Sequence, residues 1–199
     1  MNKLLKSSNS KEISSKINIL NNSRKLFERY GYQKTTLTDI AKSMGKVKSA
    51  IYYYFSGKEE IFAQVVKDEA AVFLKELIKA TEKGVTPVEK LELYVEARIE
   101  LMQKVATRYA FLKNEFFELM PIIDKNRFEA DQKEKEFVTS ILKNMNDNNE
   151  ISNPTFTAEL LVTSIKGLEV QMYVTDELII KKEHLKPFRD FIIYGIINK

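Results

Sequence analysis

Two short helical segments joined by a glycine, between residues 35 and 55, constrain the fold of this chain more than any other feature. The first has apolar residues at i, i+3, i+4 and i+7, the spacing of one helix face: Leu37, Ile40, Ala41 and Met44. Thr36 and Asp39 are spaced to cap this helix, because a hydroxyl and a carboxylate satisfy the unpaired amides at a helix start. Gly45 supplies the turn into a second short helix that ends at Phe55. The pattern indicates a helix-turn-helix.

The second helix of this pair has two different faces. On a helical wheel, one side gathers apolar residues that we expect to pack inward: Val47, Ile51, Tyr54 and Phe55. The other side carries Lys46, Ser49 and Tyr53, flanked by Lys48, Ala50 and Tyr52. Small side chains let the backbone approach a groove wall, while lysines and tyrosine hydroxyls donate to phosphates or base acceptors. We therefore expect this outer face to contact duplex DNA.

The charge of the chain is unevenly distributed. Residues 1–58 hold twelve basic and three acidic residues, a net charge of +9, whereas the remainder carries −5. A basic segment joined to an acidic one is typical of a protein that binds a polyanion with one part only. A lysine-rich solvated surface would give the same count, so the helix-turn-helix pattern decides in favour of DNA.

Lys58 stands where a cation is unfavourable unless an anion is present. Ser56-Gly57-Lys58-Glu59 has the spacing of a capping box, which predicts that Lys58 is the second residue of the next helix. A positive charge there opposes the helix dipole, but a DNA phosphate bound to the same amides would make it favourable. Phosphate binding is our preferred interpretation, and a side chain that points into solvent is the alternative.

The rest of the chain also predicts helices. Glycine (6) and proline (4) are few, and no alternating run suggests a strand. We expect a first helix over 15–30 after a polar tail, a fourth over 58–82, a fifth capped by Thr86-Pro87-Val88-Glu89, and later helices over 109–120, 124–145, 154–177 and 183–198. The fold class is therefore all-α.

Composition excludes several function classes. The chain has no cysteine and one histidine, so disulfides, cysteine-ligated metals, thiol nucleophiles and histidine triads are not expected. Carboxylates are scattered over solvent-facing helix positions, and we predict neither an enzyme nor a metal or cofactor site. No stretch approaches the ~18 apolar residues of a membrane span or the pattern of a signal peptide, and we expect a cytoplasmic protein.

The N-terminal segment resembles the TetR (tetracycline-repressor-like) family of transcriptional regulators over about 15–66. The residues that carry the resemblance are Gly31-Tyr32, Thr35-Thr36, Asp39-Ile40-Ala41, Gly45, Lys48, Ile51-Tyr52, Tyr54-Phe55, Lys58-Glu59 and Phe62. Lys46-Val47 stands where the family usually has Val-Ser, so the second helix of the pair lacks the usual hydroxyl cap.

The resemblance implies an all-helical homodimer of about nine helices. Residues 1–57 would hold a tail and a three-helix DNA-binding domain, and 58–199 a helical bundle that binds a ligand and dimerises. The residues expected at the DNA are Thr36, Thr38, Lys46, Lys48, Ser49, Ala50, Tyr52, Tyr53 and Lys58. Repression is the usual mode of such proteins, and activation stays open.

Arg98 interrupts an apolar stripe of the fifth helix, and a buried arginine needs a partner. It could bind the anionic head of an otherwise apolar ligand, or it could pair internally with a carboxylate such as Glu115 or Glu118. The ligand residues of the first interpretation are Tyr94, Arg98, Met102, Phe111, Phe116, Phe117, Met120 and Phe128. The aromatic run among them could equally be plain core.

Residues 156–174 are apolar on nearly every side, and 188–197 have a similar character. We expect these two helices to form a four-helix interface with a second copy, whereas a monomer could use the first as a central core helix. The interface residues expected are Leu160, Ser164, Gly167, Leu168, Gln171, Phe188, Ile192 and Gly195.

The function expected from the sequence is a dimeric regulator that binds double-stranded, palindromic operator DNA. A small, largely apolar effector, anionic if Arg98 binds it, would release the protein. A helical carrier without DNA binding is the main alternative, but it leaves the basic segment unexplained.

Overall fold

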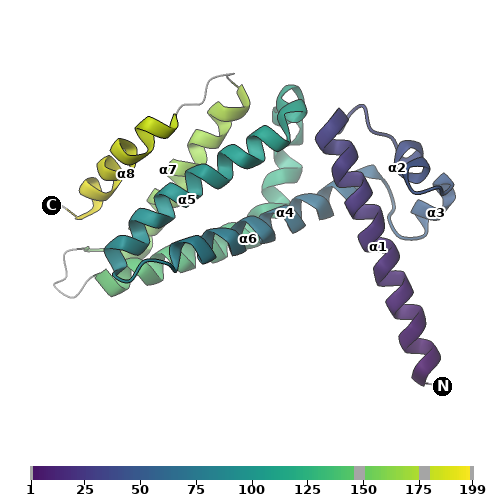
Figure 1. The fold of residues 1–199 in the computed structure, drawn as a ribbon, viewed down its shortest axis with the longest axis horizontal. Helices are drawn as coiled ribbons and strands as arrows, with labels where there is room; N and C mark the ends of the chain where they lie inside the picture. The colour runs from purple at the N-terminus through teal and green to yellow at the C-terminus, as the bar shows by residue number, and fades with distance from the viewer. Residues whose placement is uncertain (1, 146–150, 175–179, 198–199) are drawn as a thin grey trace. The chain divides into compact units, whose positions relative to one another are not determined.

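The computed structural model describes residues 2–145, 151–174 and 180–197, and no strand occurs among them (Figure 1). Eight α-helices and one 3-10 helix make up this part of the chain, as expected for an all-α protein. Their bounds are α1 Asn2–Tyr30, α2 Leu37–Ser43, α3 Lys48–Tyr52, α4 Lys58–Thr81, α5 Pro87–Arg108, η1 Ala110–Glu115, α6 Phe116–Met145, α7 Pro154–Val174 and α8 Lys182–Ile197.

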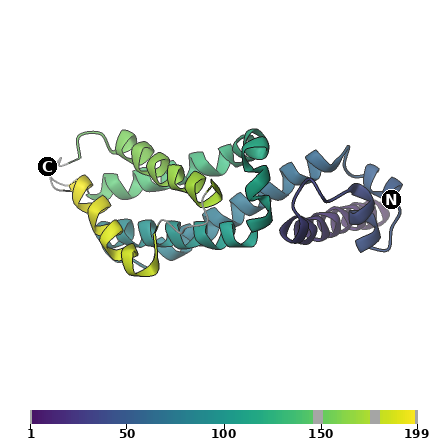
Figure 2. The same ribbon diagram turned by 90° about the horizontal axis from the view of Figure 1, so that it is seen from above.

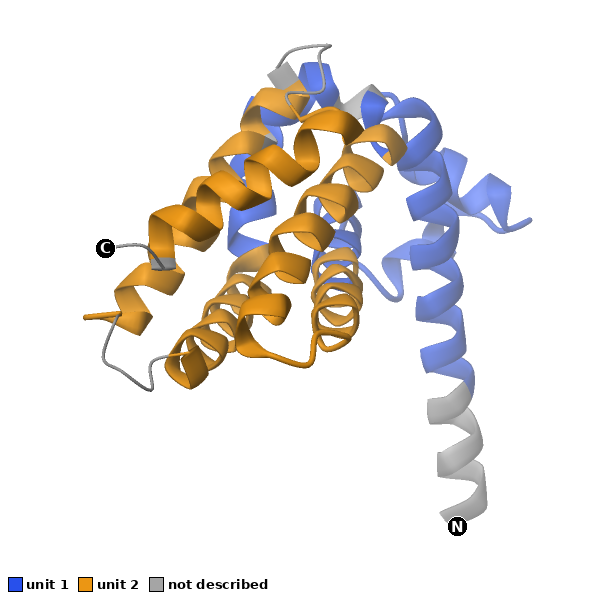
Figure 3. Ribbon diagram, turned by 60° about the vertical axis from the view of Figure 1, so that its left-hand side comes forward, with its two compact units in different colours: residues 1–68, 109–126 blue, residues 69–108, 127–199 orange. Residues whose placement is uncertain are grey.

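The chain divides into two compact units (Figure 3). Unit 1 comprises residues 1–68 and 109–126, and unit 2 comprises 69–108 and 127–199. Helices α4 and α6 each begin in unit 1 and continue into unit 2. The boundary at 57/58 expected from the sequence therefore lies inside unit 1, because the start of α4 packs with α1. A functional division at that point stays a proposal.

Unit 1 is held together by an aromatic cluster. The ring centroids of Phe27 and Phe62 lie 5.4 Å apart, and the Tyr32 ring lies 4.9 Å from that of Phe62. Ile40 and Ile51 bring α2 and α3 onto the same core and are fully buried. Gly31 and Gly45 have φ values of 83° and 65°, the left-handed conformation that ends α1 and turns α2 into α3. The sequence predicted both turns.

Unit 2 is a helical bundle in which α5 packs against α7 and α8 (Figure 2). Its core is apolar and drawn from all of its helices: Leu77, Leu91, Val95, Ile99, Val138, Leu142, Leu161, Ile165 and Ile193. The predicted start of α5 is confirmed, because Glu89 Oε2 accepts from the backbone N–H groups of Val85 (2.8 Å) and Thr86 (3.1 Å). This capping box fixes the turn between α4 and α5.

Three helix ends differ from the sequence prediction. Helix α1 begins at Asn2 rather than near residue 15, because extending a formed helix requires no new nucleation. The segments 109–120 and 124–145 form η1 and one long α6, in which Pro121 is exposed. Helix α4 starts at Lys58, so this lysine is its first residue and not its second. The predicted ends of the last two helices, at 177 and 198, lie outside the described residues.

None of the helices in the part of the chain that the structure describes is long and apolar enough to cross a membrane.

Candidate DNA-binding site

A reciprocal capping box fixes the first helix of the helix-turn-helix. The Thr36 backbone N–H donates to Asp39 Oδ2 (2.9 Å), and the Asp39 N–H donates to Thr36 Oγ1 (3.2 Å). The Thr36 hydroxyl also donates to Asp39 Oδ2 (2.6 Å), and the hydrogen bonds from the Thr36 hydroxyl and backbone N–H lower the pKa of Asp39 below its ordinary value. The predicted cap is confirmed, and it anchors the start of α2 through local contacts alone.

The outer face of α3 is open to solvent. Tyr53 is 75% exposed and Tyr52 51%, and Lys46, Lys48 and Ser49 are exposed as well. Ala50 is half-buried, while Thr36 and Thr38 on the preceding helix are exposed. Ile51 and Phe55 are buried beneath them, as predicted. Small, basic and phenolic side chains thus cover one surface, with the apolar anchors on the other side.

Val47 is the exception on the predicted inward face. It is 70% exposed. Val47 is the N-cap of α3, and its backbone is extended (φ −95°, ψ 154°), so the helical wheel does not apply to its side chain. No side chain caps α3 at this position, as expected where valine replaces a hydroxyl residue. The exposed valine therefore adds an apolar group to the outer face.

Aromatic contacts organise this face. The Lys48 ammonium lies 5.5 Å from the centroid of the Tyr52 ring, and the rings of Tyr53 and Tyr54 meet edge to face at 4.8 Å. Tyr54 is half-buried and supports its exposed neighbour. The two outermost tyrosines are thus held by neighbours while their surfaces remain accessible.

Lys58 folds back onto its own unit. Its Nζ donates to the Tyr32 carbonyl at 2.8 Å and lies 4.1 Å from the centroid of the Tyr32 ring. Partial burial lowers the pKa of Lys58, while the nearby Glu115 raises it. The predicted solvent-pointing alternative is wrong, because the ammonium binds the Tyr32 and Gln33 carbonyls in the turn that follows α1. Binding of a phosphate by the same ammonium stays a proposal.

The contacts of Gln33 with two acidic residues could not be predicted from the sequence. Gln33 donates its backbone N–H to Glu115 Oε2 (2.9 Å) and its Nε2 to Glu118 Oε2 (2.7 Å). Glu115 is buried, at 8% exposure. These bonds tie η1 and the start of α6 to the loop that leads into α2. Helical periodicity cannot reveal a contact between residues more than eighty positions apart.

Arg98 lies in an internal ion pair. Its Nε donates to Glu134 Oε1 at 2.7 Å, and the Tyr94 hydroxyl donates to the same oxygen at 2.7 Å. Arg98 and Tyr94 are fully buried and Glu134 is 3% exposed. Burial and the neighbouring carboxylate raise the pKa of Tyr94 far above its ordinary value. The internal alternative is therefore the one observed, with Glu134 as the carboxylate and not Glu115 or Glu118.

The other predicted ligand residues do not share one place. Met102 is buried beside Arg98 in unit 2, whereas Phe116 is buried in unit 1. Phe117 and Phe128 on α6 are 65% and 63% exposed, and Met120 is half-buried. The side chain of Phe111 lies outside the described ones. The aromatic run thus divides between core and surface.

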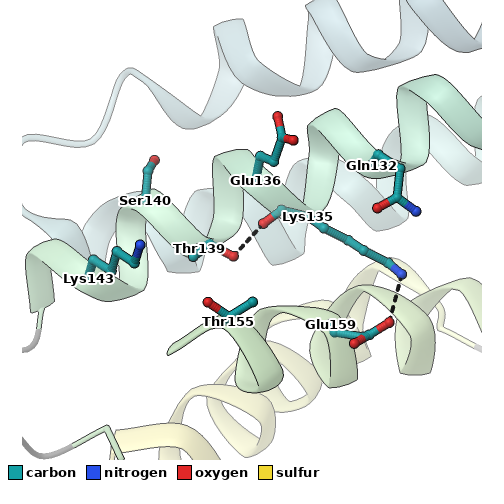
Figure 4. A pocket seen from close by; sticks show the side chains of 8 residues that line it. All are labelled: Gln132, Lys135, Glu136, Thr139, Ser140, Lys143, Thr155 and Glu159. Carbon is teal, nitrogen blue, oxygen red and sulfur yellow. Dashed lines mark hydrogen bonds and ion pairs between the residues drawn. The ribbon is translucent and has the colours of Figure 1, made fainter. Parts of the chain in front are cut away.

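A pocket of about 510 Å³ lies between α6 and α7 in unit 2 (Figure 4). All of its lining residues carry polar or charged side chains: Gln132, Lys135, Glu136, Thr139, Ser140, Lys143, Thr155 and Glu159. None of the predicted ligand residues is among them. Lys135 Nζ donates to Glu159 Oε1 at 3.0 Å, and Thr139 donates to the Lys135 carbonyl. Its lysine and acid side chains balance in charge, unlike a site for an apolar anion.

The predicted dimer residues form an exposed stripe on α7 and a partly exposed one on α8. Leu160 is 57% exposed, Ser164, Gly167, Gln171 and Gly195 are exposed, and Leu168, Phe188 and Ile192 are half-buried. A Cβ atom built on Gly167 or Gly195 would meet nothing within 4 Å. Three further aromatic side chains on these helices, not among the predicted interface residues, are more exposed than Leu160: Phe156 (60%), Phe191 (76%) and Tyr194 (65%).

Comparison with known proteins identifies the N-terminal segment. Residues 19–65 match the family described as bacterial regulatory proteins, tetR family. A 49-residue segment is 47% identical to the biofilm operon icaADBC HTH-type negative transcriptional regulator IcaR of Staphylococcus aureus, and 61 residues are 38% identical to its Staphylococcus epidermidis counterpart. The S. aureus match covers 25% of this chain and 26% of the relative, so the chain spans about a quarter of that protein.

Solved structures resemble the chain over nearly its whole length. A transcriptional regulator from Cytophaga hutchinsonii superposes with a TM-score of 0.67 at 25% identity, covering 90% of this chain and 97% of the other. The fatty acid degradation regulator FadR of Bacillus halodurans gives 0.69 at 16% identity, over 92% and 97%. A TetR/AcrR-family regulator from Thermobifida fusca gives 0.66 at 20%, over 93% and 97%. The resemblance to the TetR family is confirmed by the N-terminal match and by this shared fold.

Proposed function

We propose that this chain is a dimeric transcriptional repressor that a small molecule releases from its operator. Its N-terminal segment matches the TetR family, and its fold is that of solved regulators. The observation that carries the DNA-binding part is the exposed outer face of α3, set on a capped and buried scaffold. Repression is supported by the IcaR relatives, which are negative regulators and share this segment.

In this proposal the outer face of α3 enters the major groove. Ser49 and Ala50 allow close approach, and Tyr53 reaches the base edges. Lys46, Lys48, Tyr52 and the two threonines Thr36 and Thr38 bind the phosphates on either side. One of the three ammonium hydrogens of Lys58 remains available for a phosphate after its two backbone acceptors, Tyr32 (2.8 Å) and Gln33 (3.4 Å), are satisfied.

Dimerisation is proposed through α7 and α8. Leu160, Phe191 and Tyr194 expose most of their apolar surface, and Gly167 leaves room for another backbone to approach. Exposed apolar surface of this kind marks an interaction site. An isologous interface places two α3 helices on one operator, which is then palindromic with half-sites ~34 Å apart.

Effector release is proposed to act through α4, which begins at Lys58 in unit 1 and ends in the core of unit 2. A coupling of ~1–3 kcal/mol, a 5- to 150-fold loss of operator affinity, is sufficient for a switch. Since Arg98 is already paired with Glu134, the apolar side chains around Met102 supply the binding in this proposal. A solved protein of the same fold is a regulator of fatty acid degradation, which is in keeping with an apolar effector.

The test begins with a duplex enriched from a random library by the full chain. The proposal predicts nanomolar-range binding to a palindrome, a steep fall in affinity with salt, and loss of binding in a chain that lacks residues 1–57. Calorimetry of an identified apolar effector with and without the duplex then tests coupling, because the two affinities must change by the same factor. Salt-independent DNA binding, or equal binding without residues 1–57, contradicts the proposal.

A further inference from the structure

Val47 exposes an aliphatic side chain on the outer face of α3, which lies next to α2 at the edge of unit 1 (Figure 1). It is 70% exposed, and the two lysines beside it, Lys46 and Lys48, are exposed as well. Among residues 46–53, all of which the structure describes, no other exposed side chain is aliphatic. The valine is therefore an isolated aliphatic group among basic, hydroxyl and phenolic side chains.

A valine at this position does little for the folded chain on its own. It is the N-cap of α3, and no side chain caps the helix there, whereas a serine or threonine hydroxyl would accept a hydrogen bond from a backbone N–H. Its high exposure means that it also gains little from burial. Proteins depart from such local rules most often at functional sites, so the valine indicates a contact made outside the chain.

The backbone on both sides of Val47 is fixed by hydrogen bonds. The Lys46 N–H donates to the Ala41 carbonyl at 2.9 Å, and the Ala50 N–H donates to the Val47 carbonyl at 3.0 Å. The side chain is branched at Cβ, which restricts its only side-chain torsion. Its two methyl groups are thus held in place before any partner binds, and a contact with them costs little conformational entropy.

The major groove of DNA offers one apolar partner for such a side chain. Thymine presents its C5-methyl group there, whereas the edges of guanine, cytosine and adenine present mainly hydrogen-bond donors and acceptors. A valine placed against those three bases would remove water from polar atoms without replacing its hydrogen bonds, which is unfavourable. Against thymine, the methyl groups of base and side chain bury one another. The same contact therefore favours thymine and disfavours the other bases.

We propose that Val47 contacts the C5-methyl group of one thymine in each operator half-site and so determines the base at that position. This inference rests on the proposed function, because it requires α3 to lie in the major groove, where residues at the start of a recognition helix contact base edges. Lys46 and Lys48 bind phosphates on either side of this contact. Ser49 and Tyr53 read other bases.

The test replaces the consensus thymines of the enriched operator by deoxyuridine, one position at a time and in both half-sites together. Deoxyuridine pairs with adenine as thymine does but lacks the methyl group. At one position the wild type is expected to bind about fourfold more weakly per half-site, roughly 15-fold in all, the factor for one buried carbon. At that position the Val47→Ser chain should bind the thymine and deoxyuridine duplexes alike.

Two further variants serve as controls. Val47→Ile keeps an aliphatic group and should retain the preference for the methylated base. Val85→Ser changes an 88% exposed valine between α4 and α5, and it should leave the preference unchanged. Serine at position 47 can cap α3, so Val47→Ser is expected to fold at least as stably as the wild type, which thermal unfolding verifies.

The possible outcomes separate this inference from the proposed function. If no thymine position responds to loss of the methyl group, or if Val47→Ser keeps the wild-type response, the role of Val47 is overturned while operator binding leaves the proposed function standing. A response that persists in Val47→Ser but is lost in Ala50→Gly would assign the methyl contact to Ala50 and likewise overturn it. If the wild type enriches no duplex, both are overturned.

Discussion

Arg98 Nε lies 2.7 Å from Glu134 Oε1, and both side chains are removed from solvent. The Arg98 guanidinium carbon lies 4.8 Å from the centroid of the Phe73 ring, and the Tyr94 hydroxyl donates to Glu134 Oε1. Two charges, a phenol and an aromatic ring thus form one buried cluster that joins α4, α5 and α6 in unit 2. Its role is structural, and it gives the first prediction.

Breaking this pair from one side should be strongly destabilising. Glu134→Leu leaves the guanidinium buried without its carboxylate and should lower the free energy of unfolding by about 3–5 kcal/mol. The double variant Arg98→Met with Glu134→Leu should recover most of that loss, because neither member of this pair is left buried without the other. Urea unfolding at neutral pH measures both. A double variant no more stable than the single one would show that the cluster contributes more than charge compensation.

The capping box of α2 should make unit 1 sensitive to acid. The pKa of Asp39 is lowered in the folded chain, so its stabilising effect is present at neutral pH and is lost as the pH falls below the ordinary carboxyl value toward the folded pKa. Thr36→Ala should lower the free energy of unfolding by about 1 kcal/mol at neutral pH. Its effect should shrink toward pH 3. Thr38→Ala, at an exposed threonine two residues further along, is the matched control, and an equal, pH-independent effect of both changes contradicts this role.

Lys58 should act on DNA without affecting base preference. Lys58→Met should weaken binding to all duplexes by the same factor and reduce the salt slope by ~0.9, the share of one phosphate. Because Lys58 also holds the Tyr32 carbonyl, thermal unfolding must be followed in parallel. Weaker binding with an unchanged salt slope would show that Lys58 contacts no phosphate and acts only through its bond to the Tyr32 carbonyl.

Charged residues on the exposed stripe of α7 and α8 should separate the subunits. Leu160→Glu with Phe191→Glu should give a monomer at micromolar concentration and abolish operator binding, since a single half-site cannot supply the affinity of two. Phe117→Glu is the control, because this side chain is equally exposed but lies on α6. Light scattering reads the mass directly. A monomeric wild type, or a double variant that stays dimeric, would contradict the proposal that α7 and α8 form the dimer interface.

The short-range features of unit 1 could be predicted from the sequence, and its long-range contacts could not. Thr36, Asp39 and Gly45 lie within one or two turns of each other, so their spacing encodes the cap and the turn. Val47 was misplaced because it lies at a cap, where helical periodicity no longer holds. Gln33 meets Glu115 only because the chain returns from η1, and no local pattern predicts that return.

The partner of Arg98 in the buried cluster of unit 2 is also a long-range contact, but the sequence around Glu134 contains a pattern that could have indicated it. The sequence predicts that Arg98 needs a carboxylate, but the candidates it suggests are the nearer ones in sequence, Glu115 in η1 and Glu118 at the start of α6. Glu134 lies between Ala130 and Val138, one turn to either side, and so interrupts an apolar stripe as Arg98 does. When two apolar helix faces each carry one charged residue, and the two charges are of opposite sign, the pattern indicates a buried ion pair between them. For residues 156–174 the sequence left two alternatives, a dimer interface and a central core helix, because the exposure of these residues depends on how the bundle packs.

The central claim is that the outer face of α3 reads DNA sequence. Duplexes enriched from one random library by the wild type and by Ser49→Ala and Tyr53→Phe chains test it most directly, with Lys58→Met as the backbone-contact control. The account predicts a palindromic consensus for the wild type, an altered consensus at the bases facing residues 49 and 53 in the two variants, and the wild-type consensus at lower affinity for Lys58→Met. Enrichment of no sequence by the wild type, or the same consensus from every chain, would contradict it.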